Sequence, residues 1–163
     1  VDTNDSSGTA MLISTASPED GGLTQWSALS LSSTGEVAWR RLLSAGNGTM
    51  SHPYALTSDG VGGAVVAGHM YPASPSIFSK VGLPVGRMLR FSSSGAVVWD
   101  VTFKPDDGLS DHNVECYGVA PTLDGGYVAT CGYGCMPETC KKVRVGKQNK
   151  IWQGLAHRGD ANG

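Results

Sequence analysis

Apolar and polar side chains alternate along much of this chain, in short runs separated by turns rich in serine and glycine. The clearest run spans residues 97–103, where apolar side chains occupy every second position: Val97, Trp99, Val101 and Phe103. A period of two residues places these side chains on one face of a strand and the intervening ones on the other. The run therefore predicts a half-buried β-strand with Trp99 as its largest anchor.

The chain also repeats itself at a spacing of 60 residues. The pattern Leu-x-Leu-x-x-x-Gly-x-Val-x-Trp ends at Trp39, and it recurs, with Phe for the second Leu, ending at Trp99. A serine-rich turn divides each copy, so each copy predicts one hairpin. A second hairpin follows each tryptophan, with a glycine-containing turn at residues 58–63 in one copy and 123–126 in the other.

Weaker copies extend the pattern toward both ends. Residues 4–13 resemble the second hairpin, and residues 143–152 resemble the first. The total is about eleven strands, which divide a single domain into approximate hairpin units at residues 1–28, 29–69, 86–132 and 141–163. The sequence therefore predicts an all-β fold with somewhat under three four-stranded units.

The repeated tryptophan hairpin, followed by Asp-Gly-Gly-Tyr-Val at residues 124–128, resembles the blades of extracellular β-propellers. It is also loosely similar to the tryptophan-docking blades of quinoprotein propellers. The resemblance implies a partial β-propeller of about three antiparallel blades, and it implies architecture rather than chemistry.

Closed propellers need about four to eight blades, so about three would leave long edges unpaired. We expect further chain or a partner to complete the ring, because the chain starts at Val1 rather than methionine and ends in a polar segment at Gly163. A β-sandwich with the same number of strands is the competing architecture, although the 60-residue spacing favours the propeller.

Composition supports short strands joined by turns and excludes some partners. Hydrophobic residues make up 40% of the chain, charged residues only 16%, and there are 23 glycines. The net charge is −2 and basic residues cluster only at 141–144, which argues against nucleic acid as a partner. No apolar stretch is long enough to form a transmembrane segment, and no signal peptide is present.

All four cysteines lie within 25 residues. If residues 122–125 form the hairpin turn, Cys116 lies directly opposite Cys131, at a separation that suits a disulfide. Cys135 and Cys140 would then close a small loop. A zinc or iron–sulfur site is the alternative, but the C-x₃-C-x₄-C spacing differs from the tight C-x₂-C pairs of zinc ribbons.

Two sequons, at Asn4 and Asn47, fall in predicted loops and mark possible sites of glycosylation. Together with the clustered cysteines they favour a secreted or extracellular protein, or one in another oxidising lumenal compartment.

The sharpest candidate site involves two histidines. His52 and His112 each lie thirteen residues after a repeat tryptophan, at the entry of the strand expected to be innermost in its blade. Equivalent positions of neighbouring blades converge on the central channel, so the two imidazoles could bind one metal ion or an anionic ligand, with Asp111 and Glu115 adding oxygen ligands. The alternative is that each histidine hydrogen-bonds loop backbone in its own repeat.

Other motifs carry less weight. The acidic loop 106–111 lacks the order of an EF-hand loop, and Arg158-Gly159-Asp160 spells an adhesion tripeptide in what we expect to be an exposed polar tail. No nucleophile motif and no phosphate-binding glycine loop is present. The insertion at residues 70–86 is the preferred interaction surface, because long loops on such folds commonly contact partners.

The sequence favours a non-catalytic extracellular binding or structural module that has no cofactor and contacts protein or glycan within a larger assembly. The alternative is part of a metal- or quinone-dependent enzyme propeller, with a metal ion bound by His52 and His112.

Overall fold

The computed structural model of the protein describes residues 10–16, 25–43, 50–72, 83–104, 112–134 and 152–160. Every regular element in these ranges is a β-strand, which confirms the all-β prediction, and they contain no helix that could span a membrane. The strands are β1 Ala10–Ala16, β2 Gln25–Leu31, β3 Val37–Leu43, β4 Met50–Ser58, β5 Ala64–Tyr71, β6 Val85–Phe91, β7 Val97–Phe103, β8 Asn113–Pro121, β9 Tyr127–Gly134 and β10 Trp152–Gly159.

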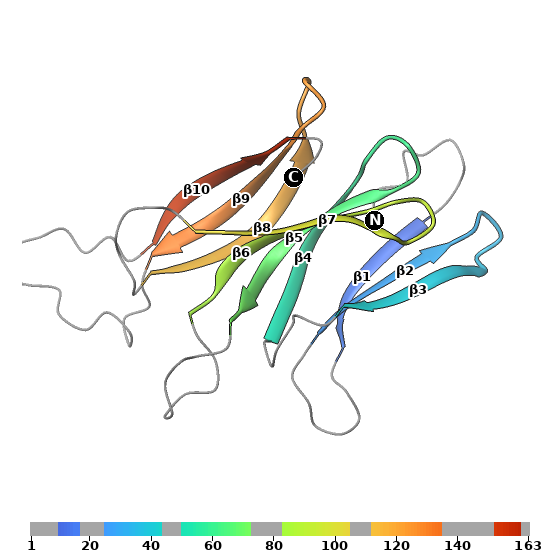
Figure 1. Ribbon diagram of the computed structural model, residues 1–163, viewed down its shortest axis with the longest axis horizontal. Helices are drawn as coiled ribbons and strands as arrows, with labels where there is room; N and C mark the ends of the chain where they lie inside the picture. The colour runs from blue at the N-terminus through green and yellow to red at the C-terminus, as the bar shows by residue number, and fades with distance from the viewer. Residues whose placement is uncertain are drawn as a thin grey trace, which may run out of the picture.

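The strands form three antiparallel sheets that lie side by side (Figure 1). The middle sheet has the strand order β4-β5-β6-β7, the first sheet β1-β2-β3 and the third β10-β9-β8. Within the described ranges none of them closes on itself, and only the middle sheet has four strands.

Each strand of the outer sheets corresponds, through the sequence repeat, to one strand of the middle sheet. Hairpin β2–β3 matches β6–β7 and has the same turn, in which Gly35 donates to the carbonyl of Ser32 and Gly95 to that of Ser92, both at 2.9 Å. Hairpin β8–β9 matches β4–β5, because the first strand of each carries a β-bulge at the same position. In the part of the chain that is described, the first sheet therefore lacks a counterpart of β4, and the third lacks a counterpart of β7.

The sheets do not coincide with the hairpin units predicted from the sequence. One sheet boundary falls between β3 and β4, inside the unit 29–69, and the other between β7 and β8, inside the unit 86–132. The repeat itself is unchanged, but the structural units begin later than the sequence pattern suggested, at residue 50 rather than 29 and at residue 113 rather than 86.

Two apolar clusters join the sheets, one on each face of the middle sheet. Val66 and Leu89 face the first sheet, whereas Val65, Ala67 and Met88 face the third. The middle sheet is therefore covered on both sides. A two-sheet sandwich would bury only one face of each sheet.

Trp39 holds the first sheet against the turn that joins β6 to β7. Its indole Nε1 donates to the carbonyl of Ser93 at 2.8 Å, and the Nε of Arg41 donates to the carbonyl of Gly95 at 3.1 Å. The indole lies so close to Gly95 that a Cβ there would be 2.5 Å from the ring. This repeat tryptophan thus anchors its strand to the neighbouring sheet.

Arg87 of β6 lies at the same interface and forms an ion pair with Asp100 of β7, within the middle sheet. Arg87 is 4% exposed, and its Nε and Nη2 donate to the two carboxylate oxygens of Asp100 at 2.8 and 2.5 Å. Its Nη1 donates to the hydroxyl of Ser51 at 3.1 Å, and its guanidinium carbon lies 4.8 Å from the centre of the Trp26 ring. Such two-point pairing is the geometry that arginine provides and lysine cannot.

A second arginine of β6 fixes the turn between β4 and β5. Arg90 donates through Nε and Nη2 to one oxygen of Asp59, at 3.0 and 2.8 Å, while the other oxygen accepts the amides of Val61 and Gly63 at 3.0 and 2.7 Å. The third sheet has an equivalent ion pair, which is exposed to solvent: Arg158 of β10 pairs with Asp124 of the turn between β8 and β9.

Candidate functional site

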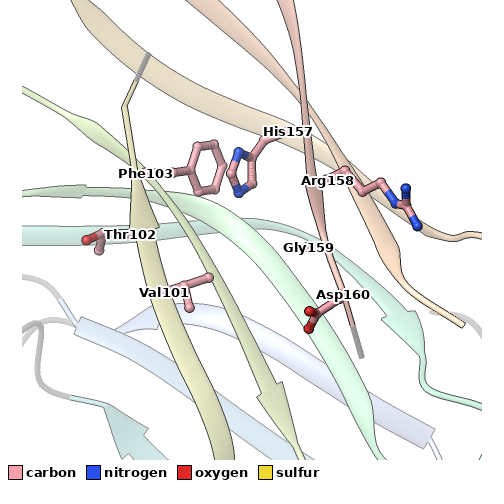
Figure 2. A pocket seen from close by; sticks show the side chains of 7 residues that line it. All are labelled: Val101, Thr102, Phe103, His157, Arg158, Gly159 and Asp160. Carbon is pink, nitrogen blue, oxygen red and sulfur yellow. The ribbon is translucent and has the colours of Figure 1, made fainter. Parts of the chain in front are cut away.

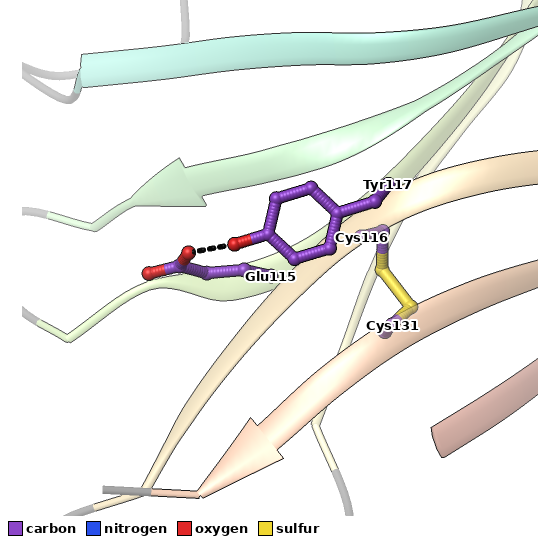
Figure 3. Close-up of a disulfide and its surroundings, with 4 residues drawn as sticks. All are labelled: Glu115, Cys116, Tyr117 and Cys131. Carbon is purple, nitrogen blue, oxygen red and sulfur yellow. Dashed lines mark hydrogen bonds between the residues drawn. A yellow bond between two sulfur atoms is a disulfide. The ribbon is translucent and has the colours of Figure 1, made fainter. Parts of the chain in front are cut away.

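The predicted disulfide between Cys116 and Cys131 is present. It links β8 to β9, where the two residues lie directly opposite one another (Figure 3). Both side chains are buried in the cluster between the middle and third sheets. The bond therefore fixes the strand that starts the third sheet.

The reason for this pairing differs from the predicted one. Thr122 donates to the carbonyl of Gly126 at 2.8 Å, so Pro121 faces Tyr127, and the turn is one residue longer than expected. A β-bulge at Tyr117 adds one residue to β8 and brings the cysteines back into register. The turn assignment was wrong by one position, and the bulge compensates for it.

The bulges also correct the alignment of the histidines. Tyr54 of β4 is the extra residue of a matching bulge, so it is the counterpart of Tyr117. Two positions before each bulged tyrosine lie His52 in β4 and Glu115 in β8, whereas His112 precedes β8 altogether. The interpretation of His52 and His112 as equivalent positions is therefore wrong.

The two histidines also have different neighbours. The ring of His52 is centred 5.3 Å from that of His69 and 5.8 Å from that of Tyr71. The ring of His112 packs edge-on against Tyr133 at 4.8 Å. In the described ranges no three histidine, cysteine, aspartate or glutamate side chains are grouped so that they could hold a metal ion.

Several predicted site residues lie outside the described residues. They are Asp111, Cys135, Cys140, Asn4 and Asn47. The metal site, the second disulfide and both glycans therefore stay predictions.

The bulges build a cluster of aromatic and polar side chains where β4 and β8 lie against one another. We call it the tyrosine–histidine cluster, and it takes two residues from each of β4, β5 and β8: His52, Tyr54, His69, Tyr71, Glu115 and Tyr117. Tyr54 and Tyr117 join the middle sheet to the third, with ring centres 5.1 Å apart and planes at 64°. Each tyrosine is 51% exposed, so the cluster presents aromatic surface to solvent.

Glu115 supplies the negative charge of the cluster. The residue is only 8% exposed, and its carboxylate accepts a hydrogen bond from the hydroxyl of Tyr117 (Figure 3). Burial, together with this hydrogen bond, raises the pKa of Tyr117. Burial and then the charge of Glu115 raise the pKa of Tyr71, which lies at the start of the segment 70–86.

His69 forms the buried floor of the cluster. It is 1% exposed, its ring stacks on Tyr54 at 5.3 Å and 28°, and its Nδ1 has no hydrogen-bond partner. Burial, and secondarily the nearby His52, lower the pKa of His69 from 6.5 to about 4. The imidazole of His69 is therefore neutral at pH 7, and Glu115 is the acidic residue of the cluster.

A second surface feature is an open pocket of about 540 Å³ between β7 and β10 (Figure 2). Phe103 and His157 stack across it with ring centres 3.6 Å apart and planes at 6°. Burial lowers the pKa of His157. Arg158 and Gly159, expected in a polar tail, instead end strand β10, and Arg158 is engaged by Asp124.

Sequence reasoning missed the tyrosines although a signal was present. Tyr54 and Tyr117 are 63 residues apart, but the tryptophan hairpins repeat at 60. A comparison at the longer spacing would have aligned β4 with β8 and paired the two tyrosines.

None of the protein-family models matches this chain, and none of the curated proteins does.

Proposed function

We propose that this chain is a section of an extracellular β-propeller that serves as a non-catalytic binding module. It contacts a protein or a glycan within a larger assembly, and further chain or a partner supplies the remaining blades. The contact surface is the tyrosine–histidine cluster, which lies on the strands that would be innermost in such a ring.

The observation that carries the proposal is the pair Tyr54 and Tyr117. Two half-exposed tyrosines from neighbouring sheets meet at 5.1 Å, and each is the extra residue of a β-bulge. Bulges are common where a strand re-aims a side chain toward a functional site. Tyrosine is also enriched in binding surfaces, because it buries a large area and keeps a polar end.

Two further features support the architecture and the compartment. The three sheets pack side by side, with the middle one covered on both faces, as successive blades do. The Cys116–Cys131 disulfide is compatible with an oxidising compartment.

The proposal is tested with the purified protein on two arrays, one of glycans and one of extracellular protein domains. The double variant Tyr54→Ala/Tyr117→Ala removes the exposed rings. The matched control Val61→Ala/Leu123→Ala removes two exposed apolar side chains from turns outside the cluster. We expect the control to bind the same array members as the parent protein and the tyrosine variant to lose them. Binding on neither array, or equal binding by the tyrosine variant, would contradict the proposal.

A further inference from the structure

The tyrosine–histidine cluster contains a buried carboxylate without a cationic partner. Glu115 is bonded to the hydroxyl of Tyr117, and no lysine or arginine pairs with it among the described residues. Asp59 shows the contrast, because its side chain is 1% exposed and is paired with Arg90. A buried carboxylate that lacks such compensation is costly to keep charged.

Three tyrosines lie on one another or close to this carboxylate. Tyr117 reaches it directly, Tyr54 packs on Tyr117, and Tyr71 lies near enough for the charge of Glu115 to raise its pKa. The faces of aromatic rings carry negative potential and attract cations, most strongly where water is partly excluded. The aromatic rings and the carboxylate therefore both favour a positively charged ligand.

The buried His69 does not offset this preference at neutral pH. His69, the most buried of the six, stays neutral because burial lowers its pKa to about 4. Its unpartnered Nδ1 is a further polar group at the floor of the cluster. An anion placed here would meet Glu115, with which no lysine or arginine of the described ranges is paired.

We propose that the cluster is a binding site for an organic cation, an alkylammonium group held against Tyr54 and Tyr117 and neutralised by Glu115. The inference rests on the proposed binding function and names its ligand class. The same chemistry is presented by a lysine or methylated lysine side chain of a protein partner and by a free quaternary amine such as choline.

The test is a titration of the full chain, labelled with ¹³C in its tyrosine rings, followed by NMR. The probes are choline chloride, an N-acetylated trimethyl-lysine peptide, and 3,3-dimethylbutan-1-ol, a neutral molecule of nearly the same shape as choline. We expect choline or the peptide to shift the ring signals of Tyr54 and Tyr117 saturably, while the neutral alcohol does not. Tighter binding of the peptide would indicate a protein partner, and tighter binding of choline a free amine.

Three variants separate charge from ring contact. Glu115→Gln preserves shape and removes the charge, and we expect it to weaken cation binding about tenfold or more. Tyr117→Phe keeps the ring and should retain most of the affinity, whereas Tyr117→Ala should lose it. Thermal unfolding of each variant checks that it is folded. If Glu115→Gln or Tyr117→Ala does not fold, the remaining folded variants, with Tyr117→Phe among them, are compared with the parent protein.

Equal binding of the neutral alcohol, or unchanged affinity in Glu115→Gln, would overturn the inference. So would the absence of any shift with either cation. A neutral oligosaccharide that shifts the same two tyrosines when choline does not would overturn the cation site and leave the binding module standing. Failure of both this titration and the two arrays would remove both proposals.

Discussion

The indole nitrogen of Trp39 in the first sheet donates a hydrogen bond at 2.8 Å to the carbonyl oxygen of Ser93 in the middle sheet. The two residues are 54 positions apart in the chain, so the contact joins successive repeats rather than neighbours in one hairpin. It places a repeat tryptophan over the turn of the next sheet. The side-by-side arrangement of the sheets therefore depends on residues that the sequence repeat itself supplies.

This contact can be tested with a matched pair of glycines. Gly35 and Gly95 occupy the same position of equivalent turns, with φ of +83° and +77°, but only Gly95 lies against Trp39. Gly35→Ala should cost about 1 to 2 kcal/mol, because alanine is disfavoured at positive φ. Gly95→Ala should cost about 1 to 3 kcal/mol more, because its Cβ would overlap the indole. Chemical denaturation measures both, and equal losses would show that Trp39 does not dock on this turn.

The ion pair of Arg87 gives a second prediction. Asp100→Asn leaves the buried Arg87 guanidinium without its carboxylate, and because Asp100 is itself partly exposed we expect a loss of about 1 to 2 kcal/mol in the free energy of unfolding, less than for a fully buried pair. The control is Asp124→Asn, which removes the partner of Arg158 from an exposed pair and should leave the unfolding midpoint almost unchanged. If both substitutions have the same effect, Arg87 is not held as described.

The disulfide gives a third prediction. Peptide mapping without reduction should recover Cys116 linked to Cys131, and it should do so also in a variant with Cys135 and Cys140 replaced by serine. Because the bond spans 15 residues, reducing it should lower the free energy of unfolding by about 3 kcal/mol. A peptide that joins Cys116 to any other cysteine would contradict the register of β8 and β9.

The pH dependence of stability gives a fourth. The pKa of His69 in the folded protein, about 4, lies below its ordinary value of 6.5, so the unfolded chain takes up the proton first as pH falls. Stability should therefore be lost between about pH 6.5 and pH 4 and level off below that, by up to about 3 kcal/mol from this residue. His157, whose pKa burial also lowers, contributes in the same direction.

Comparing the protein with His69→Phe isolates the contribution of His69. Denaturation across this pH range should show a shallower loss in the variant, with the remaining slope due to His157 and the carboxylates. Parallel curves would mean that His69 is not buried in its neutral form.

The hairpins could be predicted from the sequence because they depend on local signals. The period of two around Trp39 and Trp99, with a serine and glycine turn between apolar runs, specifies strands and turns without knowledge of the rest of the fold. The same signals could not show where one sheet ends and the next begins, since that boundary is set by which strands pair.

The 60-residue repeat could not predict the tyrosine–histidine cluster, for a physical reason. A β-bulge adds one residue and shifts the pairing of all later residues of the strand. The alternation of apolar and polar side chains around Tyr54 and Tyr117 does not predict either bulge. The Cys116–Cys131 pair was found only because the bulge offset an error in the turn. His52 was singled out, but it was paired with His112 rather than with Glu115.

The proposal that this chain is a section of a propeller is best tested by a structure of the full-length protein, from cryo-electron microscopy or crystallography. We predict that a strand pairs antiparallel along the outer edge of β10, in the place that β7 holds in the middle sheet. We also predict that another strand lies on the free edge of β1, in the place of β4. A structure in which those two edges remain unpaired would contradict the proposal.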